Sequence, residues 1–196
     1  NEHYKTSLII EKLKKGITIA LISDAGTPAI SDPGYLLVRR ALEEGIKVKC
    51  LPGPTALIPA IVQGGIPCDR FIFEGFLPVK EQARESVLSA LIDRTFTTVY
   101  YEAPRRILDT VTDIQRVLGD RQIVVAKELS KTFETYVSGS AQDVIDYLNA
   151  DVAHQKGEFV VMIGPAKVSD QAIPSEAMSL LSVLCEHMPL KKAAAV

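Results

Sequence analysis

Residues 17–45, ITIALISDAGTPAISDPGYLLVRRALEEG, contain the pattern that decides the fold. The run 17–23 is apolar and rich in β-branched residues, which is typical of a buried strand. A loop of Gly, Pro, Ser, Thr and Asp follows it, and residues 35–45 then show helical periodicity with a glycine stop. This order predicts a strand, a long loop and a helix, which is the repeating unit of an α/β protein.

The same order recurs along the chain. KVKCL at 47–51 predicts a strand followed by a helix, and a further strand is predicted at 70–77. Predicted helices and strands then alternate as far as RQIVVAKEL. The stretch KTFETYVSGS has no helix before it and predicts an antiparallel return, and EFVVMIG is the last predicted strand. We therefore expect a mixed sheet in the second half.

Both ends of the chain are predicted to be helical. Residues 4–15 predict an amphipathic helix closed by Gly16, and the final segment predicts a helix interrupted at Pro189. Neither terminal segment shows a cap at the end of the chain, so we expect the chain to be cut at both ends.

Composition excludes several classes of protein. The 196 residues are 47% hydrophobic and carry 22 Lys and Arg against 24 Asp and Glu, a formal net charge of −2. A chain this apolar is not intrinsically disordered, and its charge balance excludes nucleic-acid binding driven by bulk charge alone. Any RNA contact would need a local basic patch.

The cysteines and histidines form no metal or disulfide pattern. The three cysteines are far apart in the sequence, and the three histidines show no i, i+4 pair. No apolar run approaches the length of a membrane span, and the amino end lacks the layout of a signal peptide. We expect a cytoplasmic protein without a metal site or a membrane contact.

Two predicted strands end in loops suited to ligand binding. The first loop, SDAGTPAISDPG at 23–34, opens with SDAGTP at 23–28, and the second loop contains LPGPT at 51–55. Ligands of open α/β sheets bind beyond the carboxyl ends of strands. Gly26 and Gly53 allow the backbone to approach a ligand, and Thr55 adds a hydroxyl. The alternative stays open that these are ordinary α/β loops, with Asp32 as a helix cap.

Three other groups of residues could take part in catalysis or ligand binding. Asp24 and Asp32 could form a magnesium site or an acid–base pair, although nothing in the sequence fixes their separation. Arg105 and Arg106 follow a predicted strand and could bind phosphate, or they could lie exposed to solvent in the first turn of the next helix. The run 127–134 alternates in charge, which suits either proton transfer or a solvated hairpin.

Five segments together carry a resemblance to a known family. SDAGTPAISDPGYLLVRRA, LPGPTALIPAI, GIPCDRFIFEGFLP, YYEAPRRILDT and KELSKTFET occur in this order and at these spacings. They resemble the ribosomal RNA small subunit methyltransferase I family, in the tetrapyrrole (corrin/porphyrin) methylase superfamily. The resemblance runs from residue 1 to the MPLKKAAA near the carboxyl terminus.

The resemblance implies a fold and an activity. The fold is α/β, with two α/β domains of tetrapyrrole-methylase type and the cofactor cleft between them. The domains would span 1–77, without the amino-terminal strand normal in the family, and 78–165, followed by a helical segment at 166–196. The activity would be S-adenosylmethionine-dependent 2′-O-ribose methylation of a cytidine in the decoding region of small-subunit (16S) ribosomal RNA. We expect a homodimer that acts on the assembled subunit.

The resemblance also implies cofactor-binding residues. From the first loop they are Gly26, Thr27, Pro28, Ile30, Ser31 and Asp32; from the second loop Thr55 and Ala56, which join Gly53; and from the second domain Tyr101, Leu129 and Pro165.

We further hypothesise groups that act on the substrate. A ribose hydroxyl is a poor nucleophile, so a base or a cation should assist it. Glu128 or Lys127 is the predicted catalytic group, and Arg105, Arg106 and Lys131 are predicted to hold RNA phosphates. Two alternatives remain: methylation of a tetrapyrrole of the precorrin or uroporphyrinogen type, and a non-catalytic docking fragment.

Overall fold

The computed structural model describes residues 2–167 and 175–193, which belong to two compact units, Asn1–Ala166 and Lys167–Val196. The second unit contains helices α7 (Ser175–His187) and α8 (Leu190–Ala193), on either side of the expected interruption at Pro189. None of the described helices is long and apolar enough to cross a membrane.

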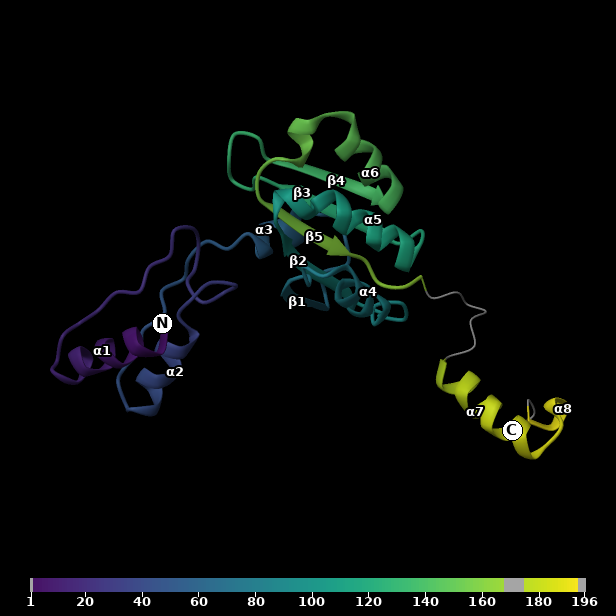
Figure 1. The fold of residues 1–196 in the computed structure, drawn as a ribbon, viewed down its shortest axis with the longest axis horizontal. Helices are drawn as coiled ribbons and strands as arrows, with labels where there is room; N and C mark the ends of the chain where they lie inside the picture. Colours follow the sequence, from purple (N-terminus) through teal and green to yellow (C-terminus); the bar gives the residue numbers. More distant parts are fainter. Residues whose placement is uncertain (1, 168–174, 194–196) are drawn as a thin grey trace. The chain divides into compact units, whose positions relative to one another are not determined.

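A five-stranded mixed sheet forms the centre of the first unit (Figure 1). Its spatial order is β1-β2-β5-β3-β4. The strands are β1 (Phe71–Phe76), β2 (Thr97–Glu102), β3 (Gln122–Lys127), β4 (Thr135–Ser140) and β5 (Phe159–Ile163).

The directions of the strands decide which ends meet. β1 runs parallel to β2, and β5 lies between β2 and β3, antiparallel to both. β1, β2 and β3 therefore point the same way and end at one side of the sheet, which we call the carboxyl edge. β4 pairs antiparallel with β3, which confirms the predicted return. The apolar run of β5 is buried throughout, as expected for a central strand.

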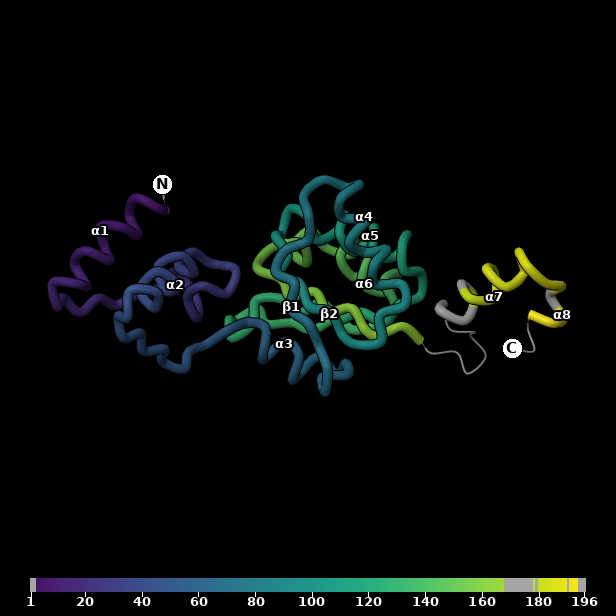
Figure 2. Tube along the Cα trace, turned by 90° about the horizontal axis from the view of Figure 1, so that it is seen from below, coloured from purple at the N-terminus to yellow at the C-terminus, as the bar shows by residue number. Residues whose placement is uncertain are grey.

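Helices cover both faces of the sheet (Figure 2). Alternate strand residues point to opposite faces. Tyr100 and Val161 belong to a core cluster that includes residues of α4 (Glu81–Ser89), α5 (Ile107–Leu118) and α6 (Ala141–Ala150). Their neighbours Val99 and Val160 belong to a second cluster with α3 (Leu57–Gln63). The two clusters explain why the strands are apolar on both sides.

Two predicted strands do not form. The runs 17–23 and 47–51 are extended but have no ladder partner among the described residues. Their side chains stay accessible: Ile22 is 83% exposed and Leu51 67% exposed. β-branched composition favours a strand only where neighbouring strands supply hydrogen bonds and side-chain contacts, and these two runs have neither. Around them, α1 (Glu2–Lys14) packs against α2 (Tyr35–Glu43).

The expected boundary at residue 77 does not interrupt the sheet. β1, which was predicted to belong to the first domain, pairs with β2 of the second. The division of residues 1–165 into two domains therefore stays a prediction. The mixed α/β architecture itself is confirmed by the pairing.

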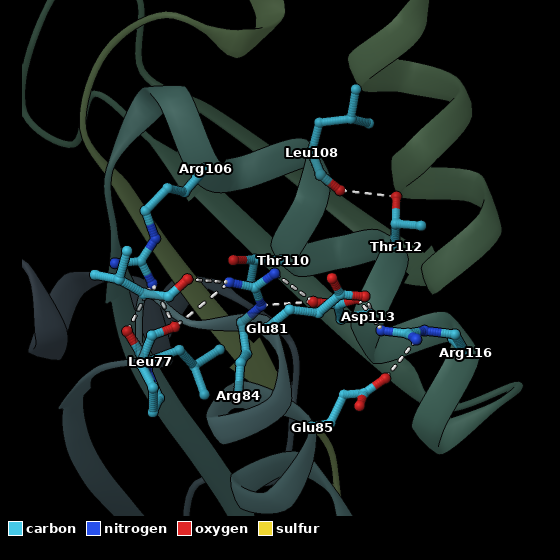
Figure 3. Close-up of polar contacts among 12 residues, drawn as sticks. Leu77, Glu81, Arg84, Glu85, Arg106, Leu108, Thr110, Thr112, Asp113 and Arg116 are labelled. Carbon is cyan, nitrogen blue, oxygen red and sulfur yellow. Dashed lines mark hydrogen bonds and ion pairs between the residues drawn. The ribbon is translucent and has the colours of Figure 1, made fainter.

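A buried ion pair joins α4 to α5 (Figure 3). Arg84 and Asp113 are both less than a tenth exposed, and Arg84 Nη2 lies 2.5 Å from Asp113 Oδ2. Arg84 Nε also donates to Asp113 Oδ2, and its Nη1 donates to the carbonyl of Val79. The pair therefore fixes the link between β1 and α4 to the helix layer.

Asp113→Ala should strongly destabilise the protein because it leaves the Arg84 guanidinium buried without its carboxylate. Removing one partner of a buried pair costs about 3–5 kcal/mol. The free energy of unfolding, measured by urea denaturation, checks this value. Asp109→Ala, at an exposed position of the same helix, is the control and should cost less than about 1 kcal/mol. Equal losses in the two variants would contradict the role of the pair.

Candidate functional site

Tyr101 holds the second predicted loop at the carboxyl edge. Its hydroxyl lies 3.3 Å from Thr55 Oγ1 and accepts a hydrogen bond of 3.3 Å from the backbone N–H of Leu57. Leu57 is the first residue of α3, so the tyrosine fixes the point where the loop enters the helix. The predicted residues Thr55 and Tyr101, which are 46 positions apart, are thus brought together.

The first loop is bonded to the second. Thr27 donates from its backbone N–H and from Oγ1 to the carbonyl of Pro54, at 2.8 and 3.0 Å. A Cβ on Gly26 would lie 3.0 Å from the same carbonyl oxygen, and one on Gly53 would lie 2.9 Å from Thr27 Oγ1. The two loops approach each other this closely because both glycines lack a side chain.

The first loop has an unusual backbone. Ala29 and Ser31 have φ of 72° and 55°, in the left-handed region that residues other than glycine rarely adopt. A Cβ on Gly75 would lie 3.5 Å from Ser31 Oγ, and β1 is irregular between Phe73 and Phe76. Backbone strain and β-bulges are both common beside binding sites. The first loop therefore lies against the irregular part of β1.

The remaining predicted cofactor residues differ in position. Pro28, Ile30 and Asp32 lie in the first loop and Ala56 in the second. Leu129 packs against the same apolar cluster as Tyr101. Pro165 follows the end of β5, which pairs with the beginning of β2, so the structure places it at the edge opposite Tyr101.

No metal site is built among the described residues: they contain no group of three or more His, Cys, Asp or Glu side chains that could hold an ion. The proposed pair of Asp24 and Asp32 lies at the two ends of the first loop, and Asp24 is exposed.

Glu128 lies in a tightly bonded turn after β3. Its Oε1 accepts from the backbone N–H of Glu158 at 2.8 Å and from Lys131 Nζ at 3.0 Å. These two donors hold the pKa of the Glu128 carboxyl below its usual value. Lys131 also contacts Glu158, and the two carboxylates raise the pKa of the Lys131 ammonium.

Both residues of the predicted catalytic pair have hydrogen-bond partners within the protein. A carboxylate with a lowered pKa is a weak proton acceptor near neutral pH, whereas a general base works best with a pKa near the operating pH. These contacts show that Glu128 shapes the turn, and its role in proton transfer stays a prediction. Lys127 donates from Nζ to the carbonyl of Ala153 at 2.5 Å, which anchors it on the short 3-10 helix η2 (Val152–Gln155).

The two predicted phosphate-binding arginines have different positions. Arg106 donates from Nη2 to the carbonyl of Leu77 at 2.6 Å and to Glu102 Oε2 at 3.1 Å, and only 14% of its side chain is exposed (Figure 3). Arg106 therefore uses its guanidinium inside the protein, and its phosphate contact stays a prediction that this geometry does not support. Arg105 is exposed in the 3-10 helix η1 (Pro104–Arg106) and forms no ion pair with a described residue.

Glu102 was missed by the sequence interpretation. Its carboxylate is fully buried, accepts from Thr110 Oγ1 at 2.7 Å and binds Arg106. The i, i+4 spacing of Glu102 and Arg106 was the available signal, but it crosses from a strand into a helix, where such spacing has no fixed meaning.

Comparisons with known proteins place this geometry in a family. Residues 1–145 match the family model described as Tetrapyrrole (Corrin/Porphyrin) Methylases. Solved structures share the fold. The methyltransferase CobJ is 17% identical with a TM-score of 0.62, covering 88% of this chain and 74% of its own. A uroporphyrin-III C-methyl transferase from Thermus thermophilus, complexed with S-adenosyl homocysteine, is 15% identical with a TM-score of 0.52, covering 84% and 74%.

Curated relatives are much closer in sequence. The ribosomal RNA small subunit methyltransferase I of Vibrio cholerae serotype O1 is 44% identical over 198 residues, which is 100% of this chain and 69% of the relative. That of Haemophilus influenzae is 46% identical over 199 residues, 100% of this chain and 70% of the relative. The chain belongs to the tetrapyrrole methylase family of methyltransferases and, within it, to the ribosomal RNA small subunit methyltransferase I family.

Glu128→Gln should lower stability at neutral pH but not in acid. A carboxyl whose pKa is lower in the folded than in the unfolded state stabilises the fold above its unfolded pKa, about 4.3 for Glu. This stabilisation is lost as the pH falls through the folded value. Urea midpoints of wild type and variant should differ at pH 7, and the difference should shrink as the pH is lowered below about 4.3. Glu11→Gln, at an exposed position of α1, should leave the pH 7 midpoint unchanged. A difference independent of pH would contradict the assignment.

Proposed function

We propose that the chain transfers a methyl group from S-adenosyl-L-methionine to the ribose 2′-hydroxyl of a cytidine in the decoding region of small-subunit ribosomal RNA. The observation that supports this proposal is that two loops are held together at the carboxyl edge, where Thr27 bonds to Pro54 and Thr55 contacts Tyr101. The relatives of this chain are named for the ribosomal RNA of the small subunit. The neighbour named as a uroporphyrin-III C-methyl transferase is below 20% identical and shares the fold alone.

The residues at the joined loops fit the cofactor. Gly26 and Gly53 stand where a Cβ would meet the facing loop, so the backbones of the two loops pack directly against each other. Thr27, Thr55 and Tyr101 supply hydroxyls beside that backbone. We assign the cofactor to the two loops, with Leu129, which packs against the same apolar cluster as Tyr101, as an apolar contact. The bound cofactor would supply a methyl group that is already activated as a sulfonium.

The chain's own residues position the acceptor. Transfer needs the attacking oxygen in line with the methyl group, and positioning of this kind lowers a barrier by about 7–11 kcal/mol in well-oriented cases. Arg105 and Lys131 are exposed cations at the carboxyl edge and would hold phosphates of the RNA. Glu128 fixes Lys131 through their 3.0 Å contact and so acts as a positioning residue.

The substrate should be an assembled subunit rather than free RNA. A formal charge of −2 gives the chain no bulk attraction for phosphate. Local cations, combined in a homodimer from two chains, would instead recognise a shaped ribonucleoprotein surface. This places the reaction in the cytoplasm, where subunits are assembled.

Methyl transfer from labelled S-adenosyl-L-methionine to purified small subunits tests the proposal. Nuclease digestion of the RNA should give labelled 2′-O-methylcytidine, with less label on protein-free RNA. A label on a base would overturn the ribose assignment, and a label on uroporphyrinogen instead of RNA would overturn the substrate class.

Gly26→Ala should weaken cofactor binding at least tenfold in calorimetric titration with S-adenosyl-L-methionine. The added Cβ meets the Pro54 carbonyl and separates the two loops. Gly45→Ala is a matched control: its φ of 70° gives similar backbone strain, but no atom lies within 4 Å of the added Cβ. The control should bind within twofold of wild type. Equal affinities of the two variants would remove the loop contact from the cofactor site.

A further inference from the structure

The carboxyl edge exposes two aromatic rings. Phe133 follows β3 in the turn that contains Glu128 and is 74% exposed. Phe76 ends β1 and is 51% exposed, and its ring packs edge-on against Tyr101 at 5.9 Å between centroids. Singly exposed apolar side chains are common on protein surfaces, so these rings point to a partner only through their place at the proposed site and the groups around them.

The turn that presents Phe133 is fixed by its own hydrogen bonds. The backbone N–H of Lys131 donates to the carbonyl of Glu128 at 3.0 Å, and that of Glu134 donates to the carbonyl of Lys131 at 3.1 Å. Glu134 Oε2 in turn accepts from the backbone N–H of Ser130 at 2.5 Å. These contacts bracket Phe133 on both sides.

The same turn stores backbone strain. Glu128 and Ser130 have φ of 51° and 61°. A Cβ on Gly157 would lie 2.6 Å from the Glu128 side chain, so only glycine allows the turn to pack there. Such conformations persist only where surrounding contacts determine them fully. The ring of Phe133 is therefore presented by a preformed turn, which reduces the entropy lost when a partner binds.

The groups around the ring favour nucleic acid as that partner. Lys131 is two residues away with 47% of its side chain exposed, although its ammonium also pairs with Glu128 and Glu158. Arg105 lies exposed at the same edge. Proteins that bind unpaired RNA combine cations for the backbone with aromatic rings on which bases stack. Leu129, in the same turn, packs against the same apolar cluster as Tyr101, so the turn and the residue that holds the second loop share one core.

We propose that Phe133 stacks on an unpaired base of the RNA substrate, next to the nucleotide that is methylated, while Lys131 and Arg105 hold the adjoining phosphates. This assignment rests on the proposed function, because the base must belong to the RNA that receives the methyl group. Phe133 is thus a substrate-binding residue that sets KM rather than the methyl-transfer step.

Steady-state methylation of purified small subunits tests this role with three variants. Phe133→Leu keeps an apolar side chain without the aromatic face and should raise KM for subunits about tenfold at unchanged kcat. Phe133→Tyr keeps the ring and should stay within twofold of wild type. Tyr4→Leu removes an aromatic ring that is 66% exposed on α1 and should also stay within twofold. Affinity for S-adenosyl-L-methionine should be equal in all of them.

The outcomes separate this inference from the proposed function. If wild type methylates subunits and Phe133→Leu has an unchanged KM, stacking is wrong and the proposed function stands. If Phe133→Tyr is as impaired as Phe133→Leu, the side chain is making a protein contact and stacking is again wrong. If wild type binds the cofactor but leaves subunits unmethylated, the proposed function fails and this inference fails with it.

Discussion

Strand β5 joins the pair β1 and β2 to the pair β3 and β4, and so makes a single sheet. It hydrogen-bonds to β2 on one side and to β3 on the other, antiparallel to both. Because it reverses direction between them, β2 and β3 point the same way, and the loops that follow them meet at the carboxyl edge. Every residue of β5 is buried, so the free energy of apolar burial and the ladder hydrogen bonds act on the same five positions. Because of this strand, Tyr101 and Leu129 pack against the same apolar cluster.

Two buried ion pairs fix the end of β1 at the same carboxyl edge. Arg84 and Arg106 both donate to carbonyls in the short link between β1 and α4, and each is neutralised by a buried carboxylate, Asp113 or Glu102. A buried charge without a partner is expensive, so these four side chains depend on one another. Together they set where β1 ends, and with it the position of Phe76 beside Tyr101.

The sequence predicted the elements of residues 70–163 well because their apolar periodicity matches structures that form there. It failed at 17–23 and 47–51, whose composition is equally strand-like, since a strand also needs a neighbour that composition does not reveal. It also could not distinguish Arg106 from Arg105. Two adjacent arginines in one motif are equivalent in a sequence, and the structure separates them because their side chains point to different surroundings.

The sequence by itself determined the α/β order, the family and the glycine-containing loops, because local periodicity, turn residues and motif spacing are local properties of the chain. The tertiary structure decided which loops touch, which charges are buried and which ring faces solvent. Thr55 and Tyr101, or Glu128 and Glu158, are about thirty to fifty positions apart, and their contacts depend on the order and direction of strands. The same dependence lowers the pKa of the Glu128 carboxyl, since its hydrogen-bond donor comes from the segment that leads into β5.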